Sequence, residues 1–577
     1  MSARTRTFRV LIAAALWLSG SVLYAQQVEV KVLGDYPGLQ DNAEAFIGEV
    51  EGRSEQRLRR YVPTAVRQVT DALRALGYYQ PTIEWEMLPT ELPKVRLTVT
   101  PGAPVHIRSV SVTINGPARN DPTFLPVLPE KPAVGDVLNH GHYDALRQTI
   151  RNRALRLGYF DGDFSSHRLT VDPEQRVADM ELAFDSGERY RLGEVRFTGD
   201  TEIGLPLLRQ FVTISPGEPY HADKVATLNG DLSNSGYFRE VLVDANPAEA
   251  DDFVIPVKVR LSIRQPRSVS AGVGFSTDVG PRFRGTWREH WINEMGHRRG
   301  AETELSVPRQ SLSTWYELPL DPPMTDLIRL SAGYQREHIE DVESERLTLG
   351  QQWQHELDNG WLQILSMRWE GERFRIGDDP STTSSLFLPG AGYSKLRADT
   401  ALDPSRGYRL QFDVTGSHRA ALSDADILHV SVLLKGLITL ADKHRFLGRF
   451  QFGGVATNSF DDVPPSLRFF AGGDQSVRGY GYETLSPEDS DGSLVGGRYL
   501  LVGSLEYQYE LFERWRAAVF YDRGNAIDNP FDPLANGVGM GVRWVSPVGP
   551  LRFDIAKGLD PEFGGEWRVH FSMGPEL

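Results

Sequence analysis

Apolar and polar residues alternate with a period of two along most of the chain after Arg267. This is the period of a β-strand with two different faces. Many of the polar faces carry arginine, aspartate and glutamate, which are too charged for a packed core. The apolar faces are therefore predicted to meet lipid, as in a transmembrane β-barrel. In the clearest run, from Tyr499 to Leu511, the faces are Tyr499, Leu501, Leu505, Tyr507 and Tyr509 against Ser504, Glu506, Gln508 and Glu510.

The number and spacing of these runs predict the size of the barrel. About 16 runs lie between Arg267 and Leu577, or roughly 19 residues for each strand with its connection. Strands with roughly 9–11 membrane residues fit this spacing and leave room for turns. Residues 266–577 are therefore predicted to form an all-β, 16-stranded outer-membrane β-barrel.

The chain before Arg267 has a repeated pattern of another kind. A helical period ends three times in glycine and two aromatics, in ALRALGYY, RALRLGYF and DLSNSGYF, which end at Tyr79, Phe160 and Phe238. Glycine suits a helix C-terminus because it adopts the left-handed conformation without strain. Alternating strand phrases open two of the units, at Gly102 and Gly187. The repeat of roughly 80 residues predicts three α+β domains, at 26–101, 102–186 and 187–265.

The first 25 residues have the pattern of a secretory signal peptide. Arg4, Arg6 and Arg9 precede an apolar run from Val10 to Leu18, which is too short to span a membrane, and small residues surround Ala25. The formal net charge of the chain is −15, which argues against a nucleic-acid partner. Cysteine is absent, so neither disulfides nor thiolate chemistry is possible.

The sequence offers little for catalysis. It contains no G-x-S-x-G elbow, phosphate loop or H-E-x-x-H motif. His290, Glu294 and His297 could be imagined as metal ligands, but their region is predicted to alternate like a strand. We therefore expect a protein that is not an enzyme and has no metal and no cofactor.

One long loop, residues 458–497, is unusually aromatic for a connection between barrel strands. Its aromatic and apolar side chains need a surface to pack against, so the loop is predicted to fold into the barrel lumen. Arg478 in its centre then needs acidic partners on the wall, and Asp522 and Glu506 have the inward-facing parity. The side chains that require packing are Phe469, Phe470, Val477, Tyr480 and Tyr482.

The tetrapeptide VRGY, from Val477 to Tyr480, resembles the loop signature of the barrel superfamily that inserts or exports proteins across outer membranes. The three repeats resemble its periplasmic POTRA domains. The phrases YDRG, from Tyr521 to Gly524, and SPVGPLRFDIA, from Ser546 to Ala556, fit the same superfamily. Within it, the wording FFAGGDQSVRGY is most similar to the TamA branch, the translocation and assembly module subunits.

This resemblance implies a loop-to-barrel lock. The loop residues would be Arg478, Gly479 and Tyr480. Their partners would be Asp522 and Gly524, in a motif of the F-x-D-x-G kind that begins at Phe520, with Glu506 assisting.

The resemblance also implies a function and a location. The barrel would lie in the lipid of the cell outer membrane with its POTRA domains in the periplasm. It would assemble or translocate client outer-membrane proteins, autotransporters among them. A TamB-like protein anchored in the inner membrane would bind on the POTRA side.

The two ends of the barrel sheet are predicted to meet in a weak seam that opens laterally. The first strand, Ser268 to Thr277, contains Gly272 and Gly274, and glycine weakens a strand interior. The last strand, Glu566 to Gly574, is short and carries Phe571 near its end. Few hydrogen bonds are therefore expected between the two strands.

Three alternative interpretations of the protein's function stay open at this point. A two-partner secretion transporter shares the VRGY loop but usually has two POTRA domains, whereas three repeats are predicted here. The central barrel-assembly subunit usually has five. A passive porin or receptor barrel belongs to a different class and would have no periplasmic repeats.

Overall fold

The structure is a computed structural model that describes residues 27–90, 92–125, 131–200, 202–546, 549–574 and 576. The predicted signal peptide, residues 1–25, lies outside the described residues. The chain forms two compact units. One holds the first two repeats with part of the third, and the other holds the rest of the third repeat with the barrel.

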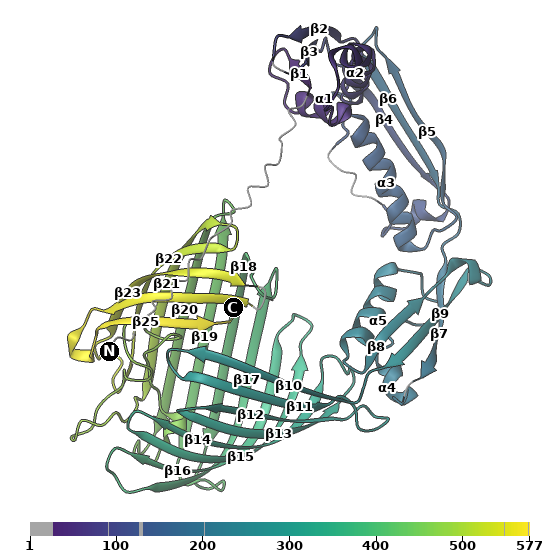
Figure 1. The fold of residues 1–577 in the computed structure, drawn as a ribbon. Coiled ribbons are helices and arrows are strands. Elements are labelled where there is room, and N and C mark those ends of the chain that lie inside the picture. Colours follow the sequence, from purple (N-terminus) through teal and green to yellow (C-terminus); the bar gives the residue numbers. More distant parts are fainter. Residues whose placement is uncertain are drawn as a thin grey trace, which may run out of the picture. The chain divides into compact units, whose positions relative to one another are not determined.

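Each repeat folds around a three-stranded sheet whose last strand in sequence lies in the middle (Figure 1). In the first two repeats this central strand runs parallel to the first strand and antiparallel to the second. Repeat 1 comprises β1 (Val28–Val32), α1 (Leu39–Ile47), α2 (Glu55–Ala75), β2 (Thr82–Leu88) and β3 (Lys94–Thr100). Repeat 2 comprises β4 (His106–Asn115), η1 (Pro117–Asn120), α3 (His140–Leu157), β5 (Asp163–Asp172) and β6 (Val177–Asp185). Repeat 3 comprises β7 (Arg191–Asp200), α4 (Leu205–Gln210), α5 (Ala222–Asn234), β8 (Phe238–Asp244), η2 (Pro247–Glu249) and β9 (Val254–Ile263).

The apolar stripe of a helix builds the core of repeat 1. Helix α2 buries residues spaced three and four apart, which is the pattern of one helix face. This face packs on alternate residues of β3, the middle strand of the sheet. The residues involved are Leu58, Val62, Ala65, Val69 and Leu73 of α2 and Val95, Leu97 and Val99 of β3.

The repeated glycine–aromatic phrase also packs each of the first two repeats on the next one. Gly158 caps α3 with φ of +86°, and a Cβ there would lie 2.6 Å from the Cβ of Tyr220. The Phe160 ring then packs edge-on against Tyr220, with 4.9 Å between ring centroids. In repeat 1, a Cβ at Gly77 would lie 2.5 Å from the carbonyl oxygen of Leu138. The phrase predicted as a helix stop is therefore also a docking point between neighbouring domains.

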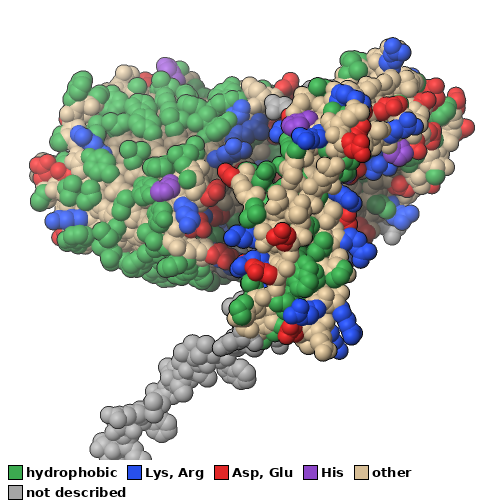
Figure 2. All heavy atoms as spheres, turned by 90° about the horizontal axis from the view of Figure 1, so that it is seen from above, with side chains coloured by type: hydrophobic (Ala, Val, Ile, Leu, Met, Phe, Trp, Pro, Cys, Tyr) green, Lys and Arg blue, Asp and Glu red, His purple; other side chains and the backbone are tan. Residues whose placement is uncertain are grey.

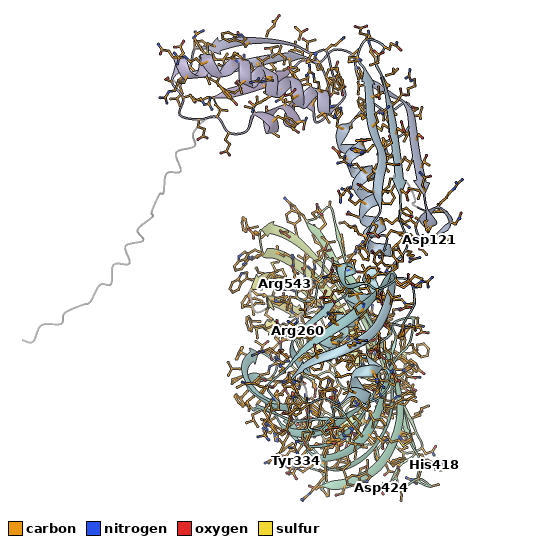
Figure 3. The ribbon with its side chains drawn as sticks, turned by 90° about the vertical axis from the view of Figure 1, so that its right-hand side faces the viewer. Asp121, Arg260, Tyr334, His418, Asp424 and Arg543 are labelled. Atoms are coloured by element: carbon orange, nitrogen blue, oxygen red, sulfur yellow. The ribbon has the colours of Figure 1, made fainter. Side chains whose placement is uncertain are left out.

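Asp121, labelled in Figure 3, ties the second repeat to the first residues of the third. Its carboxylate accepts from Tyr159 Oη at 2.9 Å and from Arg189 Nη1 at 2.7 Å. Burial and the hydrogen bond to Asp121 raise the pKa of Tyr159 to about 12. The phenol therefore remains a donor throughout the physiological range.

We expect Asp121→Ala to destabilise the periplasmic region by about 1–3 kcal/mol, because it leaves a partly buried guanidinium and a phenol without their acceptor. Urea unfolding of a fragment spanning residues 27–264 would measure the change. The matched control is Asp144→Ala, since Asp144 is 63% exposed and lies 3.7 Å from Arg147. An exposed pair of this kind contributes about 0–1 kcal/mol. Equal effects of the two substitutions would contradict the expectation.

The barrel is a single antiparallel sheet of 16 strands, β10 to β25, in sequence order, as predicted (Figure 1). The strands are β10 (Arg267–Ser276), β11 (Gly280–Glu289), β12 (Arg298–Ser306), β13 (Arg309–Pro319), β14 (Leu327–Ile339), β15 (Val342–Glu356), β16 (Leu362–Ile376), β17 (Thr382–Ala398), β18 (Arg406–Ser417), β19 (Ile427–Leu440), β20 (His444–Thr457), β21 (Tyr499–Phe512), β22 (Trp515–Ile527), β23 (Ala535–Ser546), β24 (Gly549–Gly558) and β25 (Trp567–Met573). Short 3₁₀ turns lie at Pro465–Leu467 and Pro561–Phe563.

The two faces of the sheet divide as the alternation predicts. Leu505 and Met540 are 69% and 65% exposed on the outer face, whereas Asp522 is completely buried on the inner face. Figure 2 shows hydrophobic side chains over most of the barrel surface in view. Among the described residues, no helix is both long enough and apolar enough to cross a membrane.

The alternation predicted around His290, Glu294 and His297 is wrong in one respect. Strand β11 ends at Glu289, and these three residues lie in the turn before β12. That turn binds repeat 3 instead: the carbonyl of Glu294 accepts from Gly204 N at 2.8 Å, and the carbonyl of Gly296 accepts from Tyr237 Oη at 2.8 Å. Contact with a folded domain shaped this turn, and a two-residue period in the sequence does not reveal such a contact.

Candidate functional site: the lumen loop and the barrel seam

The loop of residues 458–497, between β20 and β21, packs on the inward-facing side of the barrel wall. Two isolated bridges, Phe469 with Gly497 and Ala471 with Leu485, fold it back on itself. Its apolar side chains form two small cores with wall residues. One core joins Leu467 and Phe469 to Leu386, Leu388 and Ile427, and the other joins Val477, Tyr480 and Leu485 to Val502 and Ala535.

Arg478 holds the centre of this loop against the wall. Its Nε and Nη2 donate to the two carboxylate oxygens of Asp522, at 2.7 and 3.0 Å. Its Nη1 donates to Glu506 Oε2 at 2.8 Å. Its backbone N–H also donates to Asp522, at 3.1 Å. The contacts predicted for Arg478 with Asp522 and Glu506 are both present. The pair with Asp522 is bidentate, and bidentate hydrogen bonds between a guanidinium and a carboxylate are stronger than those between neutral groups.

Two further wall residues complete an ion-pair network that the sequence reasoning missed. Asp554 of β24 accepts from Arg478 Nη1 at 3.2 Å. Arg543 of β23, labelled in Figure 3, donates to Asp554 at 2.5 Å and to Glu506 at 2.8 Å. Two guanidinium groups therefore face three buried carboxylates. The inward parity of Asp554 within the quoted phrase SPVGPLRFDIA was the available signal for it.

The F-x-D-x-G motif on β22 gives each of its residues a separate task. The guanidinium carbon of Arg478 lies 3.3 Å from the centroid of the Phe520 ring, a cation–π contact. Asp522 supplies the carboxylate described above. A Cβ at Gly524 would lie 2.5 Å from the carbonyl oxygen of Leu501, so glycine permits the neighbouring strand β21 to approach. The spacing of two places all three residues on the inner face.

Gly479 and Tyr480 fix the loop to the last strands. Gly479 has φ of +92°, and its N–H donates to His570 Nε2 of β25 at 3.0 Å. The Tyr480 hydroxyl donates to the carbonyl of Asn536 at 2.9 Å and accepts from the N–H of Asp560 at 3.2 Å. Arg478, Gly479 and Tyr480 of the loop thus contact residues of β21 to β25.

The seam between β10 and β25 lacks a regular ladder in the described part of the chain. Thr277 N donates to the carbonyl of Phe571 at 3.2 Å, and Phe571 N donates to Thr277 Oγ1 at 3.0 Å. The Phe275 and Phe571 rings lie 6.1 Å apart. Phe571 therefore lies opposite the outer end of β10, several residues beyond Gly272 and Gly274.

The chain leaves the seam after Phe571. Gly574 donates to the carbonyl of Pro550 on the β24 side, and the Glu576 carboxylate accepts from Gln508 Nε2 of β21 at 2.8 Å and pairs with Arg445 of β20. Glu576 thus contacts the inner wall. Along β10, Val269 and Val273 are 78% and 84% exposed. Strand β11 pairs with one edge of β10, and the opposite edge of this part of β10 has no ladder partner among the described residues.

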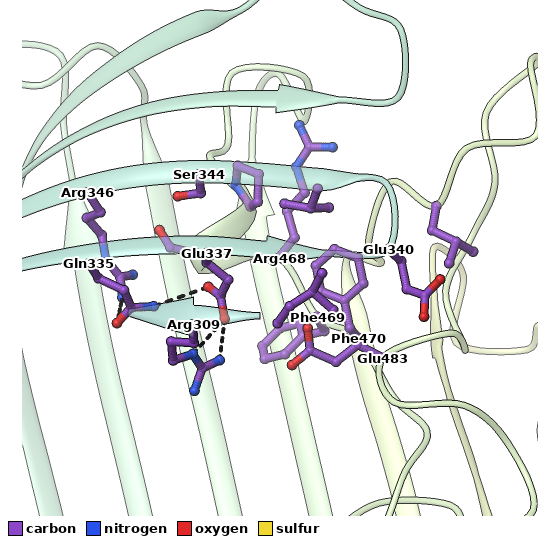
Figure 4. Close-up of a pocket in the computed structure, with 15 residues that line it drawn as sticks. Arg309, Gln335, Glu337, Glu340, Ser344, Arg346, Arg468, Phe469, Phe470 and Glu483 are labelled. Carbon is purple, nitrogen blue, oxygen red and sulfur yellow. Dashed lines mark hydrogen bonds and ion pairs between the residues drawn. The ribbon is translucent and has the colours of Figure 1, made fainter. Parts of the chain in front are cut away.

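The loop leaves a polar cavity of about 350 Å³ on the opposite side, against β13 to β15 (Figure 4). Arg309 of β13 pairs there with Glu337 of β14, with 2.8 Å between Nε and Oε1. Phe469 and Glu483 of the loop line the same cavity. The loop therefore packs against the last strands on one side and lines this cavity on the other.

Comparison with known families agrees with this architecture. Residues 297–576 match the Omp85 superfamily domain, residues 29–101 match the POTRA domain described as TamA domain 1, and residues 190–264 match the POTRA family described as a surface antigen variable number repeat. The second repeat shares the sheet order of the other two.

Individual proteins are similar over long stretches. The outer membrane protein assembly factor BamA of Nitratidesulfovibrio vulgaris is 25% identical over 72% of this chain and 55% of its own. BamA of Neisseria meningitidis serogroup B is 21% identical over 90% of this chain and 74% of its own. The chain spans about half the length of the first of these relatives. The crystal structure of BamA from Haemophilus ducreyi lacking POTRA domains 1–3 has the same fold, with a TM-score of 0.66, 16% identity, and coverage of 82% of this chain and 99% of that one.

The protein is thus an outer-membrane β-barrel preceded by periplasmic POTRA domains. The Omp85 superfamily domain matches most of this barrel, residues 297–576.

Proposed function

We propose that this protein assembles or translocates client outer-membrane proteins, autotransporters among them, by opening the seam between β10 and β25. The observation that carries the proposal is the edge of β10 that faces away from β11. Strand β10 pairs with β11 along its whole length, but from Arg267 to Phe275 this other edge has no ladder partner among the described residues. An unpaired strand edge adds an incoming strand by backbone hydrogen bonding. The names of the BamA relatives support the same class of function.

The mechanism needs no nucleotide hydrolysis and no catalytic residue. A client strand gains backbone hydrogen bonds at the β10 edge and buries apolar side chains in lipid. The contacts of Thr277 with Phe571 are the ones it would displace at the outer end of the seam.

We also infer that the protein is of the TamA type and has a TamB-like, inner-membrane-anchored partner on the POTRA side. The match of residues 29–101 to TamA domain 1 supports this. Site-directed photocrosslinking from the exposed Trp85 of the edge strand β2 to a TamB-like protein in the same envelope would test it. If neither position 85 nor other exposed positions of repeat 1 form a crosslink to such a protein, the inferred partnership is wrong.

Closing the seam covalently should stop client assembly. The chain has no native cysteine, so Ser276→Cys with Ser572→Cys, one residue along the antiparallel register from Thr277 and Phe571, gives a single possible disulfide. We expect oxidation to lower the rate of client insertion into proteoliposomes by more than tenfold, and reduction to restore it.

A matched control places the disulfide between strands that stay paired. Gln352 and Ser366 lie opposite one another in the β15–β16 ladder. Oxidation of Gln352→Cys with Ser366→Cys should leave client insertion unchanged. If the oxidised seam variant inserts clients as fast as its reduced form, lateral opening is not the mechanism.

A further inference from the structure

Three segments far apart in sequence meet at the outer end of the seam. They are the turn after β10, the lumen loop just before Arg478, and the inner face of β25. Thr277 and Asp278 represent the turn, Asp474 the loop and His570 the last strand. We call these four residues the clasp.

Asp474 bonds to both sides of the seam at once. Its carboxylate accepts from Thr277 Oγ1, at 2.9 and 3.1 Å to its two oxygens, and from His570 Nδ1 at 2.6 Å. Its backbone N–H donates to Asp278 Oδ2 at 2.8 Å. The side chain of Asp474 is 3% exposed and that of His570 is 6% exposed. The bond between Asp474 and His570 is therefore shielded from competing water, whereas the Thr277 side chain is exposed.

His570 connects the clasp to the lock. Its Nε2 accepts from the N–H of Gly479, so its proton lies on Nδ1, where it donates to Asp474. Both ring nitrogens are thus engaged within the protein. Any movement of the loop that frees Arg478 or Gly479 also pulls on the last strand, because Gly479 follows Arg478 directly.

The two carboxylates of the clasp are close enough to repel one another. Burial, the Asp474 carboxylate and the Glu483 carboxylate raise the pKa of Asp278 from its ordinary 3.8 to about 8. The imidazole of His570 also faces Asp278, because one of its ring nitrogens lies within 4.8 Å of a carboxylate oxygen of each aspartate. In the closed seam Asp278 therefore keeps its proton at neutral pH.

We propose that the clasp is the contact that keeps the seam closed, and that Asp474 must leave Thr277 and His570 before β10 and β25 separate. The clasp deepens the proposed function, and its role in client assembly rests on that function. Its role in keeping the seam closed does not rest on that function, because the seam can close without any client. Through the loop, release of Arg478 from the barrel wall thereby favours opening of the seam.

The pH dependence follows from Asp278. Opening exposes this carboxyl to water and returns its pKa towards 3.8, so opening releases a proton between about pH 4 and pH 8. The ratio of open to closed seam is expected to rise by up to tenfold for each pH unit in this window and to level off above it. Asp278→Asn removes the titration and should hold the seam closed at pH 8.

Spin labels across the seam test the clasp without any client. The cysteine-free chain accepts specific labels at Val273 of β10 and Val569 of β25, which are 84% and 51% exposed on the outer face. Pulsed electron paramagnetic resonance on the full chain in lipid nanodiscs should give one short distance for the wild type at pH 5. Asp474→Ala should add a longer distance in at least half of the molecules.

The control is Asp462→Ala, because Asp462 lies in the same loop but is 45% exposed and pairs with the exposed Arg419, at 2.8 Å. It should leave the distance distribution unchanged. Asp278→Asn should keep the short distance at pH 8, where the wild type shifts towards the longer one. Identical distributions for the wild type, Asp474→Ala and Asp278→Asn at both pH values would overturn the clasp. A seam that opens in Asp474→Ala while the oxidised seam variant still inserts clients would instead uphold the clasp and refute the proposed function.

Discussion

Replacing Arg478 with alanine should release the lumen loop and destabilise the barrel by about 3–5 kcal/mol. The substitution removes the ion pair of the buried Asp522, while Glu506 and Asp554 keep their ion pairs with Arg543. Removing one partner of a buried ion pair is costly because the remaining charge is not solvated. The first two POTRA domains should stay folded, since their cores do not include the loop.

Heat-modifiable migration of the barrel in detergent, followed by circular dichroism of the whole protein, would measure this effect. The matched control is Arg336→Ala on β14, because Arg336 is 65% exposed and lies 3.9 Å from Glu345. An exposed pair contributes about 0–1 kcal/mol, so this variant should melt like the wild type. Wild-type heat resistance of Arg478→Ala, together with normal client insertion, would exclude the lock.

The fold was predictable from the sequence because its main signals are local. A two-residue period with a charged face can be read from each run alone, as in Leu505 and Glu506 of β21. The glycine–aromatic phrases likewise end a helix by local backbone geometry, as at Gly158. The turn around His290 was misread because contact with repeat 3 shaped it. The period of a short sequence segment contains no information about its contact with a separate domain.

The candidate site was predictable only in part. Arg478, Asp522 and Glu506 stood out because a loop arginine and inward acids on adjacent strands need one another. Asp554 and His570 were missed although both have inward parity. Charges face the lumen on many strands, and the tilt and stagger of a closed barrel decide which of them meet. The sequence did not predict that Thr277 lies opposite Phe571, because the register of the seam depends on how the whole sheet closes.

Gly479 should prove harder to replace than Gly492 of the same loop. A Cβ on Gly479 would lie 2.3 Å from the backbone nitrogen of Gly558 and 2.6 Å from the carbonyl carbon of Lys557. Both atoms belong to the end of β24, which is held in the ladder and cannot move aside as a flexible side chain would. Gly479→Ala therefore has to displace the loop, and with it the hydrogen bonds that Arg478 and Gly479 make.

A substitution at Gly492 serves as the control, because it introduces the same backbone strain without the steric contact with β24. It has φ of +84°, close to the +92° of Gly479, and a Cβ there would meet nothing within 4 Å. Gly492→Ala should cost about 1–2 kcal/mol, the penalty of a left-handed residue with a side chain. Gly479→Ala should cost that amount plus the loss of the lock, and should make the loop sensitive to protease added from outside. The comparison is made by the melting temperature and by the rate of loop cleavage in reconstituted protein. Equal values for the two variants would mean that the loop does not depend on its approach to β24, because only the shared backbone strain would remain.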